Sequence, residues 1–383
     1  SKLDSTLHTY PAIEGIRNNF LGNILTFGKY GEYSYPLHHI IFAFLNPFET
    51  GSLGFRVTST LWSCLILFFL FNIIKERLNF KSYEILFFLS LLLLSPYFRS
   101  SAFWGMTENT GLLFLVLSIL YFNKLLSNQN LQNIFLVCLF SSLALYSRLQ
   151  HLFICLNFFI YLIIFLPNKK KIYLILIYFV FAIPALILIY QWGGFIDEQN
   201  TGELNSVINF TTIPRTILVV LSLIGFYSLP FIISVNSHYK YLIKKNFMKY
   251  FITLTFLVII FHICKIDILS LEETRNYAYG QGFLANFFYK LTNIQETYLI
   301  FSALGGCVVL SIFNSMKNKI LIICLIFVFS FRVHFFTEYL DPLLFILALS
   351  LLDLKKIGEI KRLKNMIIFQ IFFISTLFGA LLL

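Results

Sequence analysis

Side chains that could do chemistry stand at the start of the chain, ahead of its first long apolar run. Residues 1–56 lack a membrane-length apolar segment and contain Asp4, His8 and Glu14. A carboxylate near a hydroxyl can act as a general base, and a guanidinium can hold a phosphate through two parallel hydrogen bonds. Because ionisable groups at a membrane are costly, we treat this segment as a functional candidate.

Apolar helices must position these side chains. The chain has 383 residues, of which 58% are hydrophobic and only 12% charged, whereas soluble domains are about 25% charged. A membrane span needs about 20 apolar residues, and such runs recur along the whole sequence. The composition therefore predicts an all-α, polytopic transmembrane helical bundle. We expect about twelve spans, at 53–74, 83–98, 108–123, 131–147, 149–166, 172–191, 214–235, 248–266, 296–315, 320–331, 337–352 and 366–383.

The expected organisation is a single transmembrane domain over residues 1–383. Residues 1–52 form an outer loop, and the apolar segment 35–48 within it is too short to span, so we expect an interfacial or re-entrant helix there. Residues 53–383 form the bundle, with further outer loops near 192–213 and 267–295.

The distribution of charge predicts the orientation. With the first loop outside, 18 of the 29 Lys and Arg residues fall in inside loops, as the positive-inside rule requires. The net charge of +11 is then mostly an insertion signal and does not imply nucleic acid. Seven of the 11 outside bases are Arg, and 14 of the 18 acids lie outside. This mixture of arginines and carboxylates suits an anionic phosphate and a hydroxyl.

Several short motifs follow one another in a characteristic order. They are Asp4 with His8, Tyr35-Pro36-Leu37, Gly54-Phe55-Arg56-Val57, the segment SPYFRSSAFWGMTEN at 95–109, YSRLQ at 146–150, QWGGF at 191–195, RVH at 332–334 and EYLDP at 338–342. In this order the chain resembles the GT-C glycosyltransferases that use polyprenyl-phosphate sugars. These include protein O-mannosyltransferases, bacterial aminoarabinose transferases and dolichol-pathway glucosyltransferases.

The resemblance implies a membrane enzyme that moves a sugar from a polyprenyl-phosphate donor to a lipid, glycan or protein acceptor. Three departures stand out. Asp4 is followed by Ser5 instead of a second acid, and one proline, Pro36, stands where many members have two. No span precedes Asp4, so we expect the sequence to begin inside the protein, without the first helix of the family.

The residues receive roles from this chemistry. Asp4 is the candidate general base, and Glu108 is a second catalytic candidate that would orient a hydroxyl. Candidate cations for the departing phosphate are Arg332, His334, Arg99, Arg148 and Arg275. Candidate substrate-binding residues are His8, Tyr35, Glu14 and Trp192. Each acid could instead cap a helix, and each arginine could instead snorkel from a helix end.

No cofactor is expected. The six cysteines lie in apolar runs without CxxC spacing and are expected to be small buried hydrophobes. His38 and His39 are adjacent, so on a helix they point about 100° apart and cannot chelate one ion; we expect them to be interfacial polar residues. No cluster requires a metal, although some related families use a divalent ion.

Two other functions fit the same pattern. An O-antigen ligase or polymerase would use a large loop in the second half, for which 267–295 is the candidate. A transporter or lipid flippase would show paired halves with broken helices, and no matching halves are evident. The Ile, Phe, Lys and Asn bias suggests an AT-rich bacterial genome. We therefore expect a bacterial cytoplasmic membrane as the location, with the active site facing the periplasm.

Overall fold

The structure, a computed structural model, is built from helices. It describes residues 5–30, 35–46, 52–192, 213–234, 256, 296–312, 315–330, 340–353 and 360–382, and these residues contain no β-strand. They divide into two compact units that are each discontinuous in sequence. Unit 1 comprises residues 1–73 and 98–206, and unit 2 comprises residues 74–97 and 207–383.

Unit 1 begins with short helices. They are η1 (Ser5–Thr9), α2 (Tyr10–Asn18), α3 (Phe20–Leu25), η2 (Phe27–Tyr30) and α4 (Leu37–Leu45). Helix α4 occupies the segment expected to be interfacial. Most of α5 (Ser52–Leu78) and α7 (Pro96–Trp104) also belongs to this unit. The longer helices that follow are α8 (Thr107–Ser127), α9 (Leu131–Ser147), α10 (Leu152–Phe165), which η3 (Leu149–His151) precedes, and α11 (Asn168–Trp192).

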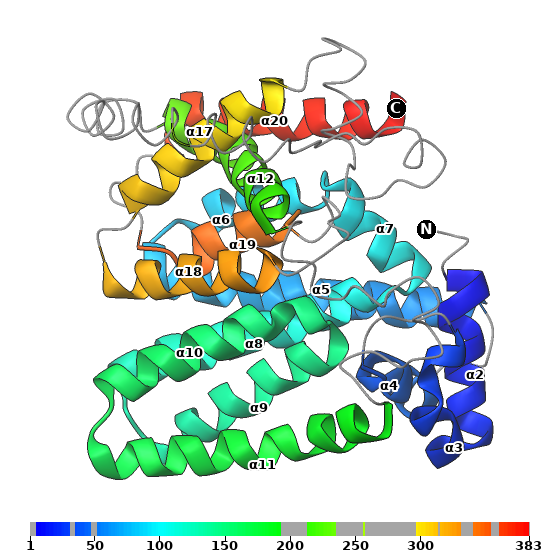
Figure 1. Cartoon of the computed structure of the whole chain (residues 1–383). Helices are drawn as coiled ribbons and strands as arrows, with labels where there is room; N and C mark the ends of the chain where they lie inside the picture. The colour runs from blue at the N-terminus through cyan, green and yellow to red at the C-terminus, as the bar shows by residue number, and fades with distance from the viewer. Residues whose placement is uncertain are drawn as a thin grey trace. The chain divides into compact units, whose positions relative to one another are not determined.

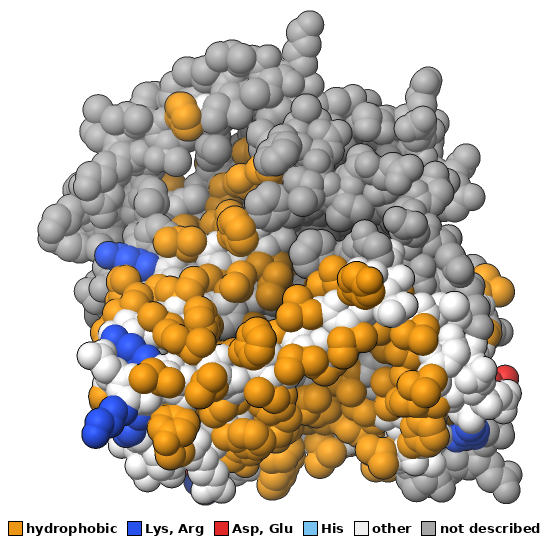
Figure 2. Space-filling view, turned by 60° about the horizontal axis from the view of Figure 1, so that its bottom comes forward, with side chains coloured by type: hydrophobic (Ala, Val, Ile, Leu, Met, Phe, Trp, Pro, Cys, Tyr) orange, Lys and Arg blue, Asp and Glu red, His pale blue; other side chains and the backbone are white. Residues whose placement is uncertain are grey.

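Helices α8 to α11 pack side by side through their apolar faces (Figure 1). Phe122 of α8 stacks on Phe158 of α10 with ring centroids 4.3 Å apart. The opposite face of α11 is apolar but exposed, and Figure 2 shows a mostly hydrophobic surface with Lys and Arg side chains at its edge. Such a helix, apolar on its outer side as well, is typical of a membrane protein.

Unit 2 contains α6 (Ser82–Leu92), α12 (Ile213–Ser234), α17 (Glu296–Ile312), α18 (Met316–Ser330), α19 (Leu343–Ser350) and α20 (Leu363–Leu382). Helices α12 and α17 approach closely because glycines meet at their crossing. A Cβ added to Gly305 would overlap the carbonyl oxygen of Leu221, and one added to Gly225 would overlap that of Phe301. Small residues allow this close backbone approach between membrane helices.

The expected span at 83–98 is broken in the structure. Helix α6 ends at Leu92 and α7 starts at Pro96, with a 76° bend between them. Proline disfavours helical geometry in the residue before it and suits the first helical position, which explains a break at Ser95. Within unit 2, Asp341 is buried and forms hydrogen bonds with the side chains of Ser95 and Tyr227.

Four described helices are long and apolar enough to cross a membrane, or five if the bent pair counts as one span. They start and end near the expected spans: Leu53–Leu78, Thr107–Ser127, Asn168–Trp192 and Thr216–Ser234. Shorter apolar helices include Leu131–Ser147 and Leu363–Phe378. The expected span at 248–266 lies almost wholly outside the described residues. These observations confirm an all-α, polytopic membrane fold.

Candidate functional site

The candidate site lies at one end of unit 1, where the starts of α4, α5 and α8 meet the ends of α7, α9 and α11. Contacts between residues far apart in the chain define this end. Tyr10 of α2 donates a hydrogen bond to the Trp104 carbonyl over 3.2 Å, and Trp192 donates one to the Leu25 carbonyl over 3.2 Å. At the other end, Lys170 donates a hydrogen bond to the Gln129 carbonyl.

Glu108 and Arg148 form an ion pair at this end. Glu108 lies in the first turn of α8, and Arg148 follows the last residue of α9. Their side chains are only 15% and 16% exposed, so water screens the pair weakly. Ser101 of α7 also lies within hydrogen-bonding reach of Glu108, with the two oxygens 3.4 Å apart. The structure therefore joins a predicted catalytic acid to a predicted phosphate-binding cation.

The start of α8 is held by buried polar contacts. Asn109 Nδ2 donates to Ser63 Oγ over 2.7 Å and to the Phe98 carbonyl over 3.1 Å. Gly111 lets the turn after α9 lie against α8, because a Cβ there would come within 2.6 Å of His151 Cε1. Sequence reasoning did not single out these residues, since Ser, Asn and Gly carry no chemical signal by themselves.

His38 and His39 are fully buried, so the expectation of interfacial polar residues is wrong. His38 Nε2 lies 3.1 Å from the Gly105 carbonyl, and Nδ1 lies 2.8 Å from Thr110 Oγ1. A carbonyl can only accept, so Nε2 carries the hydrogen and Nδ1 accepts from the Thr110 hydroxyl in the neutral ring. These two hydrogen bonds hold His38 of α4 against Gly105 and α8, so its ring does not face the membrane surface.

Tyr35 lies between two aromatic rings. Its ring stacks on Trp192 at 5.7 Å and meets Tyr146 edge-on at 5.6 Å. Burial, with a smaller effect from the Tyr146 phenol, raises the pKa of Tyr35 to about 12. Both predicted substrate-binding residues are almost inaccessible, at 3% and 5% exposure. In this structure they join the first loop to the end of α11 and do not form an open surface.

Arg56 lies beside two aromatic side chains. It belongs to the motif Gly54-Phe55-Arg56-Val57, but the sequence alone assigned it no role. Its guanidinium carbon is 4.3 Å from the Trp104 ring centroid and 5.0 Å from that of Phe103. Such cation–π contacts are favourable by roughly 0.5–2 kcal/mol, depending on desolvation. The spacing of Arg56 from Trp104 in the sequence gave no hint of this contact.

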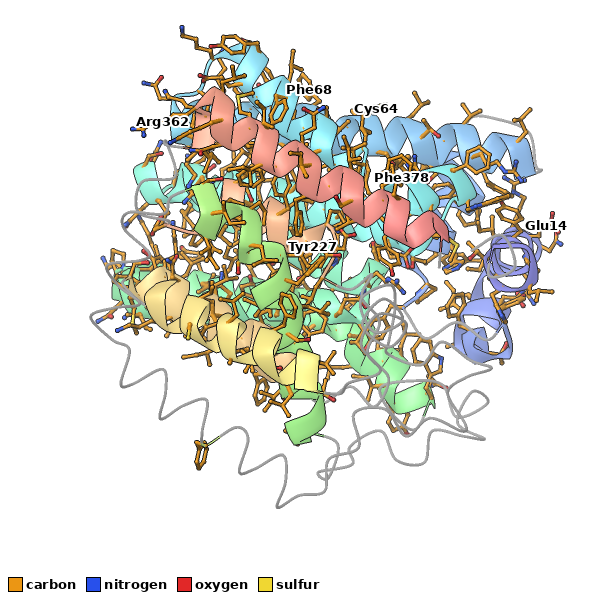
Figure 3. All side chains as sticks on the ribbon, turned by 90° about the horizontal axis from the view of Figure 1, so that it is seen from above. Glu14, Cys64, Phe68, Tyr227, Arg362 and Phe378 are labelled. Carbon is orange, nitrogen blue, oxygen red and sulfur yellow. The ribbon has the colours of Figure 1, made fainter. Side chains whose placement is uncertain are left out.

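The other predicted site residues lie apart from this group. His8 Nδ1 is 2.7 Å from the Tyr30 carbonyl, Glu14 projects outward from α2 (Figure 3), and Arg99 is exposed on α7. Four predicted residues lie outside the described part of the chain: Asp4, Arg275, Arg332 and His334. Their roles stay predictions, as do those of the described residues.

Within the described ranges, no three His, Cys, Asp or Glu side chains form a group that could hold a metal ion. This end of unit 1 offers arginines, a carboxylate and aromatic rings. Arginines can bind phosphate oxygens, and a carboxylate can orient a hydroxyl or another cation. This combination suits a phosphate-bearing, amphipathic substrate.

Comparison with known proteins agrees with this chemistry. No curated protein and no solved structure matches the chain. Residues 36–190 match the model of one family, described as dolichyl-phosphate-mannose-protein mannosyltransferase. The matched segment includes Arg56, Glu108 and Arg148. The match supports the resemblance to GT-C glycosyltransferases and indicates a membrane glycosyltransferase of the mannosyltransferase type.

Proposed function

We propose that the protein transfers a sugar from a polyprenyl-phosphate donor to a hydroxyl on a lipid, glycan or protein acceptor. The observation that carries the proposal is the family match over 36–190. The matched segment supplies Arg56, Glu108 and Arg148 at one end of unit 1. A donor of this kind has an anionic head and a long apolar chain, and the described end offers cations beside apolar helices.

Each group has a task in this reaction. The acceptor hydroxyl needs a base, and Asp4 remains the proposed one. The departing polyprenyl phosphate gains negative charge, so a cation aimed at it stabilises the transition state. Glu108 is already paired with Arg148. We therefore assign Glu108 to holding Arg148 in place and not to proton transfer.

The charge distribution supports an orientation with the site outside. The turns around Gln129 and Lys170 meet at the end of unit 1 opposite the site, and they carry Lys124 and three consecutive lysines. Lysine-rich short loops stay in the cytoplasm. The site then faces the periplasm of a bacterial cytoplasmic membrane, where a sugar on a lipid carrier is the expected donor.

The test is transfer in proteoliposomes. Purified protein is incubated with a panel of radiolabelled polyprenyl-phosphate hexoses and a membrane extract as the acceptor source. Asp4→Asn should reduce transfer about 10²–10⁴-fold, because Asn cannot accept the proton, while binding of the donor lipid stays within about twofold of wild type. Glu76→Gln, which changes an exposed acid near the end of α5 that has no proposed role, is the matched control.

Two results would contradict the proposal. One is that the wild-type protein does not increase the release of label from any hexosyl lipid in the panel. The other is movement of intact donor lipid across the bilayer without transfer, which would indicate a flippase. Near-normal transfer by Asp4→Asn would move the base elsewhere and leave the reaction class intact.

A further inference from the structure

Arg56 is a partly buried cation without an oxygen partner among the described residues. Its Nε atom is buried and donates no hydrogen bond, and no ion pair or hydrogen bond joins its guanidinium to a described side chain. The terminal nitrogens are not among the buried unpaired atoms, so this edge of the guanidinium is open to a ligand. A buried polar atom without a hydrogen bond is costly, so the position of Nε requires an explanation.

The contrast with other described arginines is informative. Arg148 pairs with Glu108, Arg77 lies 3.1 Å from Asp353, and Arg17 donates two hydrogen bonds to the Ala43 carbonyl. Each of these guanidiniums has its oxygen supplied by the protein. Arg56 has aromatic faces instead, and the described residues supply no acceptor to the hydrogen-bonding edge of its guanidinium.

The backbone that carries Trp104 and the helix that carries Arg56 are held by several contacts. Tyr10 stacks on Phe55 at 5.1 Å and donates a hydrogen bond to the Trp104 carbonyl. Ser59 of α5 donates a hydrogen bond to the Ser101 carbonyl of α7 over 3.1 Å. Gly105, with φ of +67°, turns the chain directly after Trp104. The guanidinium rests on rings carried by this backbone, and such pre-positioning lowers the entropic cost of binding an anion.

The surface around Arg56 is apolar. Leu53 is 73% exposed and Phe103 is 52% exposed, and Val57 next to Arg56 is also exposed. Apolar side chains do not stabilise a hydrated anion such as free phosphate, whereas a lipid phosphate can place its hydrocarbon chain against them. Charge and apolar surface together fit a ligand with an anionic head and a hydrocarbon tail.

We propose that Arg56, held by Trp104 and Phe103, binds the phosphate of the lipid-linked donor, with the first part of the lipid chain against Leu53 and Val57. This assignment rests on the proposed function and adds to it a specific phosphate ligand. The cation is present before the donor arrives, so it contributes to binding in the ground state as well as to departure of the phosphate.

Binding and transfer are measured on four variants. Arg56→Ala removes the cation, and Arg56→Lys keeps the charge but loses the planar fork. Trp104→Leu removes the larger ring and leaves the backbone carbonyl that Tyr10 uses. Arg362→Ala is the matched control, because Arg362 is an exposed arginine at the start of α20 (Figure 3). Thermal unfolding of each purified variant establishes that it is folded.

The probe for binding is a sugar-free polyprenyl monophosphate in nanodiscs of phosphatidylcholine. Arg56→Ala should weaken binding and raise the donor KM about 10–100-fold, the range expected for losing charge-assisted hydrogen bonds. Arg56→Lys and Trp104→Leu should give smaller losses, and Arg362→Ala should match wild type. The losses should appear mainly in KM, with kcat less affected.

Two outcomes would overturn the assignment. If Arg56→Ala binds the probe like Arg362→Ala while wild type still transfers sugar, the proposed function stands and this phosphate site is wrong. If phosphatidylglycerol in the nanodisc displaces the probe from wild type but not from Arg56→Ala, Arg56 holds a bilayer headgroup and not the donor. The binding arm needs no turnover, so it decides the assignment even where no transfer is found.

Discussion

The crossing of α12 and α17 allows a sharp test of the fold, because two neighbouring glycines differ in their surroundings. A Cβ on Gly305 would overlap the Leu221 carbonyl oxygen and lie 2.7 Å from the carbonyl carbon. A Cβ on Gly306 meets nothing within 4 Å. Gly305→Ala and Gly306→Ala thus make the same chemical change in the same helix turn, with opposite steric consequences.

The magnitude follows from the contacts. Ordinary Cβ contacts begin at 3.4 Å, so the backbone of α12 must move away from α17 by about 0.7 Å or more. Backbone cannot rotate away as a side chain can, and overpacking of this kind costs about 1–3 kcal/mol. Gly306→Ala instead gains up to about 1 kcal/mol of helix propensity. The two variants should differ in stability by about 1–4 kcal/mol.

Thermal unfolding of purified protein in one detergent measures this difference. Gly305→Ala should unfold several degrees below wild type, and Gly306→Ala at or slightly above it. A third variant, Gly225→Ala, should behave like Gly305→Ala because its Cβ would meet the Phe301 carbonyl. Equal midpoints for the Gly305 and Gly306 variants would refute the close crossing.

Two further predictions concern the candidate site. Glu108→Gln should lower the unfolding free energy by about 1–3 kcal/mol, because Arg148 then keeps a largely buried charge without its carboxylate. Adding Arg148→Gln to this variant should cost much less than Arg148→Gln costs in wild type. Strictly additive losses in this double-mutant cycle would show that the pair is not coupled. The raised pKa of Tyr35 means that the folded state keeps the phenol proton after the unfolded chain has lost it. The resulting contribution to the unfolding free energy is complete below pH 10 and is lost as pH rises towards 12. The stability of Tyr35→Phe should therefore be less sensitive to alkali in that range. The same dependence of stability on pH in both proteins would contradict this prediction.

Much of the fold could be predicted from hydropathy alone. The expected span at 131–147 coincides with α9, and that at 108–123 lies inside α8. The break at Ser95 was not foreseen, because the apolar run continues through it and hydropathy does not register where a proline ends a helix. The adjacent histidines were misjudged for a related reason: polarity predicts exposure, but His38 finds its partners at Gly105, directly after α7, and at Thr110 of α8.

The candidate site was harder to predict. A shared topology suggested that Glu108 and Arg148 lie at the same end, but only the structure shows that they neutralise each other. From the sequence, Arg56 was one of eleven basic residues expected on the outer side of the membrane, and its residue type did not distinguish it from the others. Its distinction comes from what surrounds it, since contacts with Trp104 depend on packing between α5 and α7 that no local pattern records.

The discontinuity of the two units has a consequence for biosynthesis. Residues 74–97 emerge early, yet their partners in unit 2 come late: Arg77 waits for Asp353, which follows it by 276 residues. At a synthesis rate of about 5–20 residues per second, the wait is about 14–55 s. During that time Arg77 and the apolar surface of α6, including Phe88 that later contacts Phe369, lack their final neighbours. Lipid can cover the apolar surface of α6 during this time, because lipid tails are as apolar as its final neighbours, whereas Arg77 has no such substitute for its carboxylate.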